Sequence, residues 1–153
     1  MSQIKNLMVS KRTKPDYVKI APSILTADFA NLGSEISSVS NAGADFIHLD
    51  VMDGSFVKNL SFGPPVIRSI RGFTGLPFDV HLMVSEPEKM LNNFAEAGAN
   101  FITVHAESCL HLDRVLNTIR LIGCKAGVAL NPHTPETIIN YVIDRIDLIL
   151  VMT

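Results

Sequence analysis

Two short apolar segments of the sequence carry polar or sulfur-containing side chains at every second position. His48, Asp50 and Met52 alternate with aliphatic residues in the first segment, and His81 and Met83 do so in the second. Because successive side chains of a strand point to opposite faces, these residues share one face of a sheet. Burying so much polarity without partners is unfavourable. The spacing therefore predicts a metal site or an acid–base site built on a sheet.

The residue types at this site favour a divalent cation. Two imidazoles and a carboxylate are suitable ligands for Zn²⁺, Fe²⁺, Mn²⁺ or Co²⁺, so we expect His48, Asp50 and His81 to hold one such ion. Asp50 could also take a proton from a carbon next to a carbonyl, while the cation stabilises the resulting enediolate. The alternative is that both histidines are core residues satisfied by hydrogen bonds, and the methionines fit core filling equally well.

The elements that must position these residues alternate between short β-rich segments and amphipathic helices. Strands are predicted at residues 19–24, 46–52, 78–83, 101–105, 125–130 and 147–152. Helical spacing of apolar residues predicts helices near 29–39, 64–71, 90–97, 112–122 and 138–143. Ser85 and Glu88 form a capping-box pattern before the third helix, and Thr134 with Pro135 is placed to begin the last one.

Repeated βα units predict a parallel sheet covered by helices, either an open doubly wound sheet or an eight-stranded barrel. Residues 42–47 and 97–102 repeat one pattern of helix end, glycine and strand entry. An eight-stranded barrel needs about 200 residues or more, whereas the sequence supplies six strands and ends directly after the sixth. We therefore expect the chain to be a fragment of a barrel.

Length and composition fit one globular domain, with 153 residues, 47% hydrophobic and 18% charged. The net charge of −2 argues against nucleic acids and acidic membranes as partners, and no apolar segment is long enough to span a membrane. The two widely separated cysteines are typical of reduced thiols in a cytoplasmic protein. Residues 1–18 are basic and predict a flexible arm, with an organelle-targeting peptide as the alternative; residues 19–153 form the predicted domain.

Three further features near the predicted strand ends have weaker signals. Ser23 ends the first predicted strand and could bind a substrate hydroxyl or cap the following turn. The loop at 53–63 is long enough to cover the site. His105 and Glu107, at the end of the fourth predicted strand, fit a role as partners of the site residues and fit a surface position equally well.

Five segments together closely resemble the ribulose-phosphate 3-epimerase family. They are Ala21–Phe29, His48–Gly54, Phe62–Pro64, Asp79–Met83 and Leu150–Thr153. The resemblance implies a (β/α)₈ barrel, with about six βα units in this chain, and an isomerase of pentose phosphate metabolism. Such an enzyme interconverts ribulose 5-phosphate and xylulose 5-phosphate by inverting carbon 3 through an enediolate.

The resemblance also implies roles for individual residues. His48, Asp50 and His81 correspond to three of four ligands of one divalent metal ion, and Asp50 to a carboxylate that transfers the proton on one face of the substrate. Ser23 and His81 correspond to substrate contacts. The three methionines correspond to a thioether cap over the reacting carbons; they are Met52, Met83 and Met152.

The chain departs from the family pattern in lacking the second catalytic Asp, on strand seven, and the glycine-rich phosphate loops. We therefore expect the 153-residue chain alone to have little or no activity, and the full-length protein to be a cytoplasmic homo-oligomer. Two alternatives stay open: an enzyme acting on a six-carbon ketose phosphate such as allulose 6-phosphate, and a non-catalytic partial barrel that binds a metal or a partner.

Overall fold

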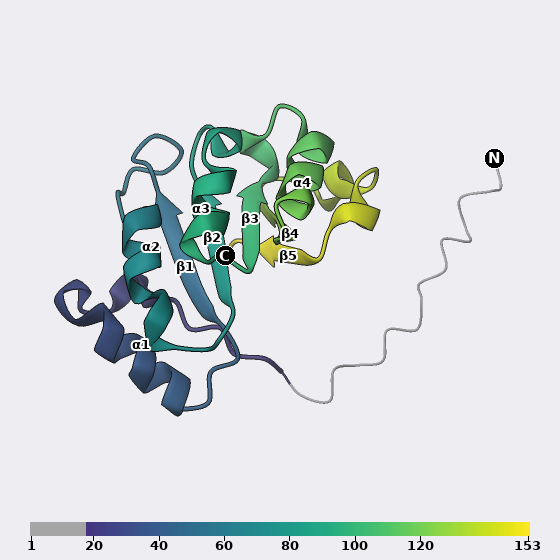
Figure 1. Ribbon diagram of the computed structural model, residues 1–153. Coiled ribbons are helices and arrows are strands. Elements are labelled where there is room, and N and C mark those ends of the chain that lie inside the picture. Colours follow the sequence, from purple (N-terminus) through teal and green to yellow (C-terminus); the bar gives the residue numbers. More distant parts are fainter. Residues whose placement is uncertain (1–17) are drawn as a thin grey trace, which may run out of the picture.

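The computed structural model describes residues 18–153, which contain one sheet of five parallel strands (Figure 1). The strands are β1 (Ile47–Met52), β2 (Phe78–Met83), β3 (Phe101–His105), β4 (Lys125–Leu130) and β5 (Leu148–Val151). They lie side by side in sequence order and each is parallel to the next. A doubly wound sheet reverses its strand order at a switch point. The uninterrupted order is instead that of a partial (β/α)₈ barrel, so the predicted barrel architecture is confirmed.

Four α-helices and seven short 3₁₀-helices precede or connect the strands within the described residues. The α-helices are α1 (Leu32–Asn41), α2 (Pro64–Ile70), α3 (Leu91–Ala97) and α4 (Leu112–Leu121). The 3₁₀-helices are η1 (Ile24–Thr26), η2 (Phe29–Asn31), η3 (Arg71–Phe73), η4 (Pro87–Lys89), η5 (Ala106–Ser108), η6 (Glu136–Ile139) and η7 (Ile143–Arg145). Figure 1 shows the α-helices following one another along the sheet, from α1 at the lower left to α4 at the upper right.

The two faces of the sheet differ in chemistry. Ile47, Leu49 and Val51 of β1 lie on what we call the outer face, which packs into the hydrophobic core and leaves them at most 4% exposed. His48 and Asp50 alternate with them and lie on the opposite, inner face. The pleat thus gives the core one set of side chains and the candidate site the other.

The prediction of a regular strand at 19–24 is wrong. The segment does run parallel to β1: the Ile20 carbonyl accepts from the Asp45 and Phe46 amides, the Pro22 carbonyl accepts from His48, and Ser23 forms an isolated parallel bridge with His48. Pro22 has no N–H to return a bond to β1, so the ladder is interrupted. The segment is therefore extended without being a full sixth strand.

The two predicted helix starts are also wrong. Ser85 does not cap a helix, because Glu86 occupies the cap position of η4, and the Ser85 amide donates to Asp53 Oδ2 at 2.8 Å. In place of a helix over 138–143 the chain forms η6 and η7. This stretch is rich in β-branched residues, which lose side-chain freedom in an α-helix, and the Thr134 hydroxyl donates to Glu107 instead of capping.

Polar residues just before the strands tie neighbouring strands together. Asp45 Oδ2 accepts the Ile20 amide at 2.8 Å, and Asn100 Oδ1 accepts the Phe78 amide at 2.8 Å. Asp45 and Asn100 are equivalent positions of the repeat at 42–47 and 97–102, so the repeat has one structural function. It fixes the start of each strand against the preceding one and hence the register of the inner face.

Gly98 ends α3 in the left-handed conformation, with φ of +106°. A Cβ there would also lie 2.6 Å from Cδ of Arg71, whose guanidinium packs over the Phe78 ring at 3.6 Å. Glycine is therefore required both by the backbone and by the close approach of Arg71.

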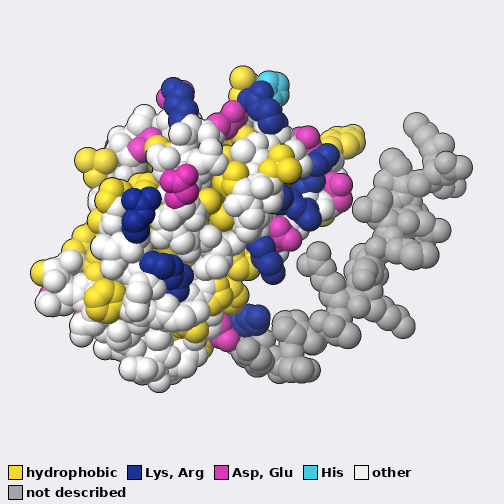
Figure 2. Space-filling view, viewed as in Figure 1, with side chains coloured by type: hydrophobic (Ala, Val, Ile, Leu, Met, Phe, Trp, Pro, Cys, Tyr) yellow, Lys and Arg dark blue, Asp and Glu magenta, His cyan; other side chains and the backbone are white. Residues whose placement is uncertain are grey.

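Basic and acidic side chains are interspersed over the face of the molecule seen in Figure 2. Within residues 18–153, no helix has the length and apolar character needed to cross a bilayer. The predicted basic arm, except for Val18, lies outside the described residues.

Candidate functional site

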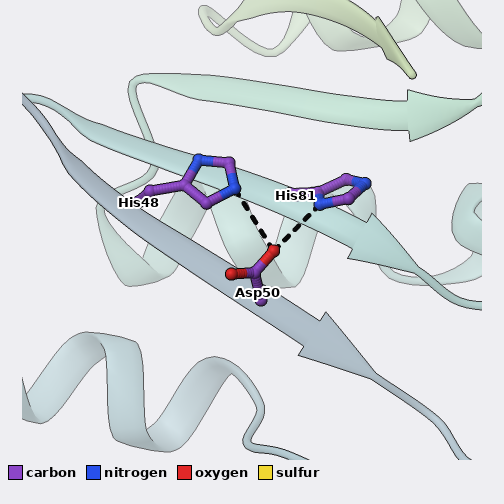
Figure 3. Close-up of side chains that lie close together, drawn as sticks. All are labelled: His48, Asp50 and His81. Atoms are coloured by element: carbon purple, nitrogen blue, oxygen red, sulfur yellow. Dashed lines mark hydrogen bonds and ion pairs between the residues drawn. The ribbon is translucent and has the colours of Figure 1, made fainter. Parts of the chain in front are cut away.

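His48, Asp50 and His81 come together on the inner face, as the sequence predicts (Figure 3). Asp50 and His81 are register partners on β1 and β2, and His48 precedes Asp50 by two residues on the same face. Asp50 Oδ1 lies 3.2 Å from His48 Nε2 and 3.0 Å from His81 Nδ1. One nitrogen or oxygen atom of each residue lies within 4.8 Å of the others, a spacing that a single metal ion could bridge.

Neighbouring groups hold the three side chains in place. His48 Nδ1 lies 2.8 Å from Asp79 Oδ2, and the Ser23 hydroxyl donates to Asp50 Oδ2 at 2.5 Å. A ligand imidazole whose second nitrogen contacts a carboxylate is a common arrangement around bound metals, because the carboxylate orients the ring. Every buried side-chain nitrogen or oxygen of the described residues has a hydrogen-bond partner.

The charges at this site are strongly coupled. Burial alone would lower the pKa of His48, but hydrogen bonds with Asp50 and Asp79 raise this pKa to about 9. Burial opposes ionisation of Asp50, yet hydrogen bonds from His48, His81 and Ser23 hold its pKa well below the usual range. Asp50 is therefore an ionised carboxylate at neutral pH.

The donor set fits a divalent cation. With metal absent, a proton on His48 balances part of the negative charge of Asp50 and Asp79. A dication could replace that proton, since metal binding requires neutral imidazole and ionised carboxylate and releases protons. The site is only partly covered, because the side chains of His48 and Asp50 are each 14% exposed.

The remaining residues predicted for the site lie at the carboxyl ends of strands. Met52 and Met83 are register partners at the ends of β1 and β2, and Met83 is 4% exposed. Met152 follows β5, where its amide donates to the Leu130 carbonyl at 3.1 Å. Ser23 both caps η1, through the Leu25 amide, and contacts Asp50, so its two proposed roles are compatible.

The sequence-based prediction omits Asp79 from the site and leaves the position of His105 open. Asp79 has the same two-residue spacing to His81 that identifies His48 and Asp50, and this spacing is the signal that could have found it. His105 is fully buried on the inner face, so the surface alternative for it is wrong; its Nε2 lies 2.9 Å from His81 Nε2. Burial lowers the pKa of His105, and the neighbouring His81 acts in the same direction.

The loop at 53–63 folds over this end of the sheet. Asp53 accepts the Ser55 and Phe56 amides through Oδ1 and the Ser85 amide through Oδ2. The Phe56 ring consequently lies against His105, with 4.6 Å between ring centroids. The loop thus covers the side of the site nearest β3.

Several curated ribulose-phosphate 3-epimerases are similar in sequence to most of this chain. Ribulose-phosphate 3-epimerase from Bacillus subtilis is 54% identical over 136 residues, which are 89% of this chain and 63% of that protein. The protein named ribulose-5-phosphate-3-epimerase, chloroplastic, from Arabidopsis thaliana is 49% identical over 147 residues, covering 95% of this chain and 52% of its own. The chain therefore spans between half and two thirds of the length of these relatives.

Solved structures of low sequence identity share the fold. N-succinyl Arg/Lys racemase from Bacillus cereus superposes with a TM-score of 0.65 at 11% identity, over 90% of this chain and 38% of that one. The α subunit of tryptophan synthase from Legionella pneumophila gives 0.60 at 15% identity, over 88% of this chain and 62% of its own. These similarities support the architecture alone.

The family model described as the ribulose-phosphate 3-epimerase family matches residues 19–153. This range includes all five strands and every residue of the candidate site. The chain belongs to the ribulose-phosphate 3-epimerase family.

Proposed function

We propose that this chain supplies the metal centre and one proton-transferring carboxylate of an enzyme that interconverts ribulose 5-phosphate and xylulose 5-phosphate. The observation that carries the proposal is the convergence of His48, Asp50 and His81 around one point of the inner face, in a chain of this family. The small-molecule substrate would be a sugar phosphate bound at the carboxyl ends of the strands, where barrel enzymes place their chemistry.

His48, Asp50 and His81 would hold one divalent ion, with Zn²⁺, Fe²⁺, Mn²⁺ and Co²⁺ as the candidates. When bound, the ion supplies a positive charge that stabilises the negative charge developing on the substrate oxygens. Asp79 keeps the His48 ring oriented with Nε2 toward this point, so the ligand geometry is prepared before the ion binds.

Asp50 is the residue that we assign to proton transfer at carbon 3. Its carboxylate is ionised, partly exposed and held from one side by the Ser23 hydroxyl. An ionised carboxylate can accept the proton from a carbon next to a carbonyl and return one to the same side. Ser23 orients Asp50 and is placed to contact a substrate hydroxyl.

The methionines are proposed to exclude water from the reacting carbons. Met52 and Met83 are adjacent at the strand ends, and Met152 follows β5 at the same edge of the sheet. Thioether side chains are apolar and adaptable, so they can cover a planar intermediate without offering it a proton.

Inversion at a carbon also requires an acid–base group on the opposite side of the substrate. Asp50 serves one side only, so the 153-residue chain with bound metal should exchange the carbon 3 proton of one epimer with solvent deuterium, with little net epimerisation. Exchange in both epimers at equal rates would contradict the one-sided role of Asp50.

The test of the activity uses protein purified from the cells that produce it, with its intact mass measured on the same sample. Conversion of ribulose 5-phosphate to xylulose 5-phosphate should be lost on chelation and restored by one of the four candidate ions. Allulose 6-phosphate serves as the comparison substrate, and a preference for it would transfer the proposal to the six-carbon ketose. If the measured mass exceeds that of the 153-residue chain, activity that survives complete removal of metal, or binding of metal without turnover of either sugar, would overturn the proposal.

A further inference from the structure

The edge of β1 that faces away from β2 changes its neighbour along the strand. Near the beginning of β1 the neighbour is an extended segment, whose Pro22 carbonyl accepts the His48 amide at 2.9 Å. This segment turns into η1 at Ile24 and leaves the edge. Because backbone polar groups need partners, the Asp50 carbonyl and the Met52 amide must find theirs elsewhere.

The Ser61 side chain supplies the missing partner. Its hydroxyl donates to the Asp50 carbonyl at 2.7 Å and accepts the Met52 amide at 3.0 Å. The Ser61 amide also donates to the Met52 carbonyl at 3.4 Å. A carbonyl cannot donate and an amide N–H cannot accept, so the groups themselves fix the direction of each bond.

The Ser61 hydroxyl takes the place of one residue of a neighbouring strand. In a parallel ladder a residue binds its neighbour twice, through its N–H and through its C=O. A hydroxyl donates and accepts at a single atom, so it serves the Asp50 carbonyl and the Met52 amide together. Alanine can do neither, and a thiol does both weakly.

Asp50 is consequently held by a hydroxyl group at each of its two ends. The Ser23 hydroxyl donates to its carboxylate at 2.5 Å, and the Ser61 hydroxyl donates to its backbone carbonyl. The carboxylate stands on a short side chain, so a displacement of the backbone at Asp50 also displaces the carboxylate.

We propose that Ser61 is a positioning residue, which fixes the backbone of β1 at residues 50–52 and thereby the place from which the Asp50 carboxylate transfers its proton. The inference rests on the proposed function, since it concerns the carboxylate assigned there. Ser61 also lies near the end of the loop at 53–63, whose beginning is held by Asp53 through the Ser85 amide. The same serine thus connects the position of this loop with that of Asp50.

The first experiment measures hydrogen exchange of backbone amides in the metal-free chain, and it needs neither metal nor substrate. We expect Ser61→Ala to lower the protection of the Met52 amide by about two- to tenfold, the usual effect of one hydrogen bond. The Ile47 amide binds the Pro77 carbonyl and should keep its protection. Equal losses at Met52 and Ile47, or a Met52 amide of the unaltered chain that exchanges as fast as in an unstructured peptide, would overturn the inference.

The second experiment measures incorporation of deuterium at carbon 3 by the zinc-loaded chain, at saturating concentrations of the epimer that exchanges. Ser61→Ala should incorporate deuterium about 10-fold more slowly, because a small displacement of a reacting group is costly in rate. Zinc affinity and the half-saturating sugar concentration should change by less than about threefold, since the side-chain contacts of Asp50 remain. Equal weakening of all three quantities would indicate a general loosening of the fold and contradict the role of Ser61.

Ser61→Thr tests whether the hydroxyl is responsible. Ser61 lines two cavities of about 490 and 390 Å³, which leave room for an added methyl group. Threonine keeps the donor and the acceptor, so deuterium incorporation should return to within about threefold of the original rate. A Ser61→Thr chain as slow as Ser61→Ala would overturn the inference. If Ser61→Ala does not fold, Ser61→Cys replaces it, because cysteine preserves the size of the side chain while weakening both bonds.

Ser69→Ala is the matched control. The Ser69 hydroxyl also donates to a backbone carbonyl at 2.7 Å, that of Val66 in α2, and Ser69 is exposed. This variant should leave Met52 protection, zinc affinity and deuterium incorporation unchanged. If the unaltered zinc-loaded chain exchanges neither epimer, the proposed function fails and this inference fails with it. If the unaltered chain exchanges one epimer and Ser61→Ala does so at the same rate, only the role of Ser61 is overturned.

Discussion

The inner face of the sheet has two halves of opposite character. On β1, β2 and β3 its side chains are polar except for Phe101 at the start of β3 and the methionines that end β1 and β2, whereas on β4 and β5 they are small or aliphatic beyond Lys125. The polar half includes His48, Asp50, Asp79, His81, Thr103 and His105, and the apolar half includes Gly127, Ala129, Leu148 and Leu150. Both halves belong to one sheet with one pleat, so the difference comes from the side chains alone.

The comparison shows that a cluster of buried polar groups is tolerated when its members satisfy one another. In the polar half Asp50 contacts both site histidines, and His48 contacts Asp79. At the boundary between the halves, Thr103 on β3 is register partner of Gly127 on β4, and its hydroxyl donates to Asp79 at 3.4 Å. The apolar half needs no such network and contributes volume rather than chemistry.

Asp50→Asn should have the largest effect, because it removes the negative charge shared by the two histidines. The loss should exceed that for removing a partner of a ligand, so we expect zinc affinity to fall by at least about 100-fold and proton exchange at carbon 3 to be lost. Calorimetry and deuterium incorporation measure the two effects. Asp113→Asn, which alters an exposed pair with Arg145, is the control. Zinc binding by Asp50→Asn equal to that of the original chain would mean that the polar half is not a metal centre.

The sequence predicts much of the polar half because its signal is local. A two-residue period needs no knowledge of other strands, and it identifies His48 with Asp50 and His81 with Met83 correctly as sharing a face. The strands at 78–83, 101–105 and 125–130 have the predicted bounds for the same reason. The segment at 19–24 shows the limit of this argument, since Pro22 removes a ladder hydrogen bond without altering the hydrophobic pattern.

The contacts between strands could not be predicted in the same way. Whether His105 lies beside His81 depends on the register of β2 and β3, which is set by residues such as Asn100 that bind backbone groups of the preceding strand. The hydrogen bond that the Ser85 amide makes likewise depends on Asp53, which is 32 positions away in the sequence. Local patterns determine which face a side chain occupies, and only the folded register determines its partner.

On the outer face, an isoleucine of β3 and an isoleucine of β5 allow the strands of the polar half to be compared with those of the apolar half. Ile102 on β3 is fully buried, whereas Ile149 on β5 is 45% exposed. Ile102→Ala should lower the free energy of unfolding by about 2–5 kcal/mol, and Ile149→Ala by about 1 kcal/mol or less, because little cavity forms at an exposed site. Chemical denaturation measures both. Equal losses would show that β5 is covered in solution by another surface, such as a second copy of the chain.

Gly127→Ala tests the boundary between the polar and apolar halves. A Cβ at this position would lie 2.9 Å from Cβ of Thr103 and closer still to its hydroxyl. We expect a loss of about 1–3 kcal/mol in the free energy of unfolding, since added volume in a packed interior forces neighbours to move. Gly72→Ala is the control, because nothing lies within 4 Å of a Cβ there. Thr103→Ala should recover part of the loss, and a Gly127→Ala chain as stable as the original would mean that the two strands are not in close contact.

The smallest expected effect of the predictions concerns the loop at 53–63, which covers only the polar half of the inner face. Burial opposes ionisation of Asp53, but hydrogen bonds from the Ser85, Phe56 and Ser55 amides hold its pKa below the ordinary 3.8. A carboxyl group whose pKa is lower in the folded state stabilises the fold above its unfolded pKa, and this contribution disappears as the pH falls through the folded value. Protection of the Ser85 and Phe56 amides against hydrogen exchange should therefore decrease on acidification below pH 3.8.

Asp53→Asn should lower that protection at neutral pH by about two- to fivefold, which corresponds to a hydrogen bond of about 0.5–1 kcal/mol. Its protection should then be independent of pH where that of the original chain declines. Asp28→Asn removes an exposed carboxylate that caps η2 and should affect the Ala30 amide without changing Ser85. If Asp53→Asn also shifts the Phe56 ring from His105, as chemical shifts of the imidazole would reveal, the hydrogen bonds of Asp53 hold Phe56 against His105. Unchanged shifts with lowered protection would mean that Phe56 holds its place by packing alone.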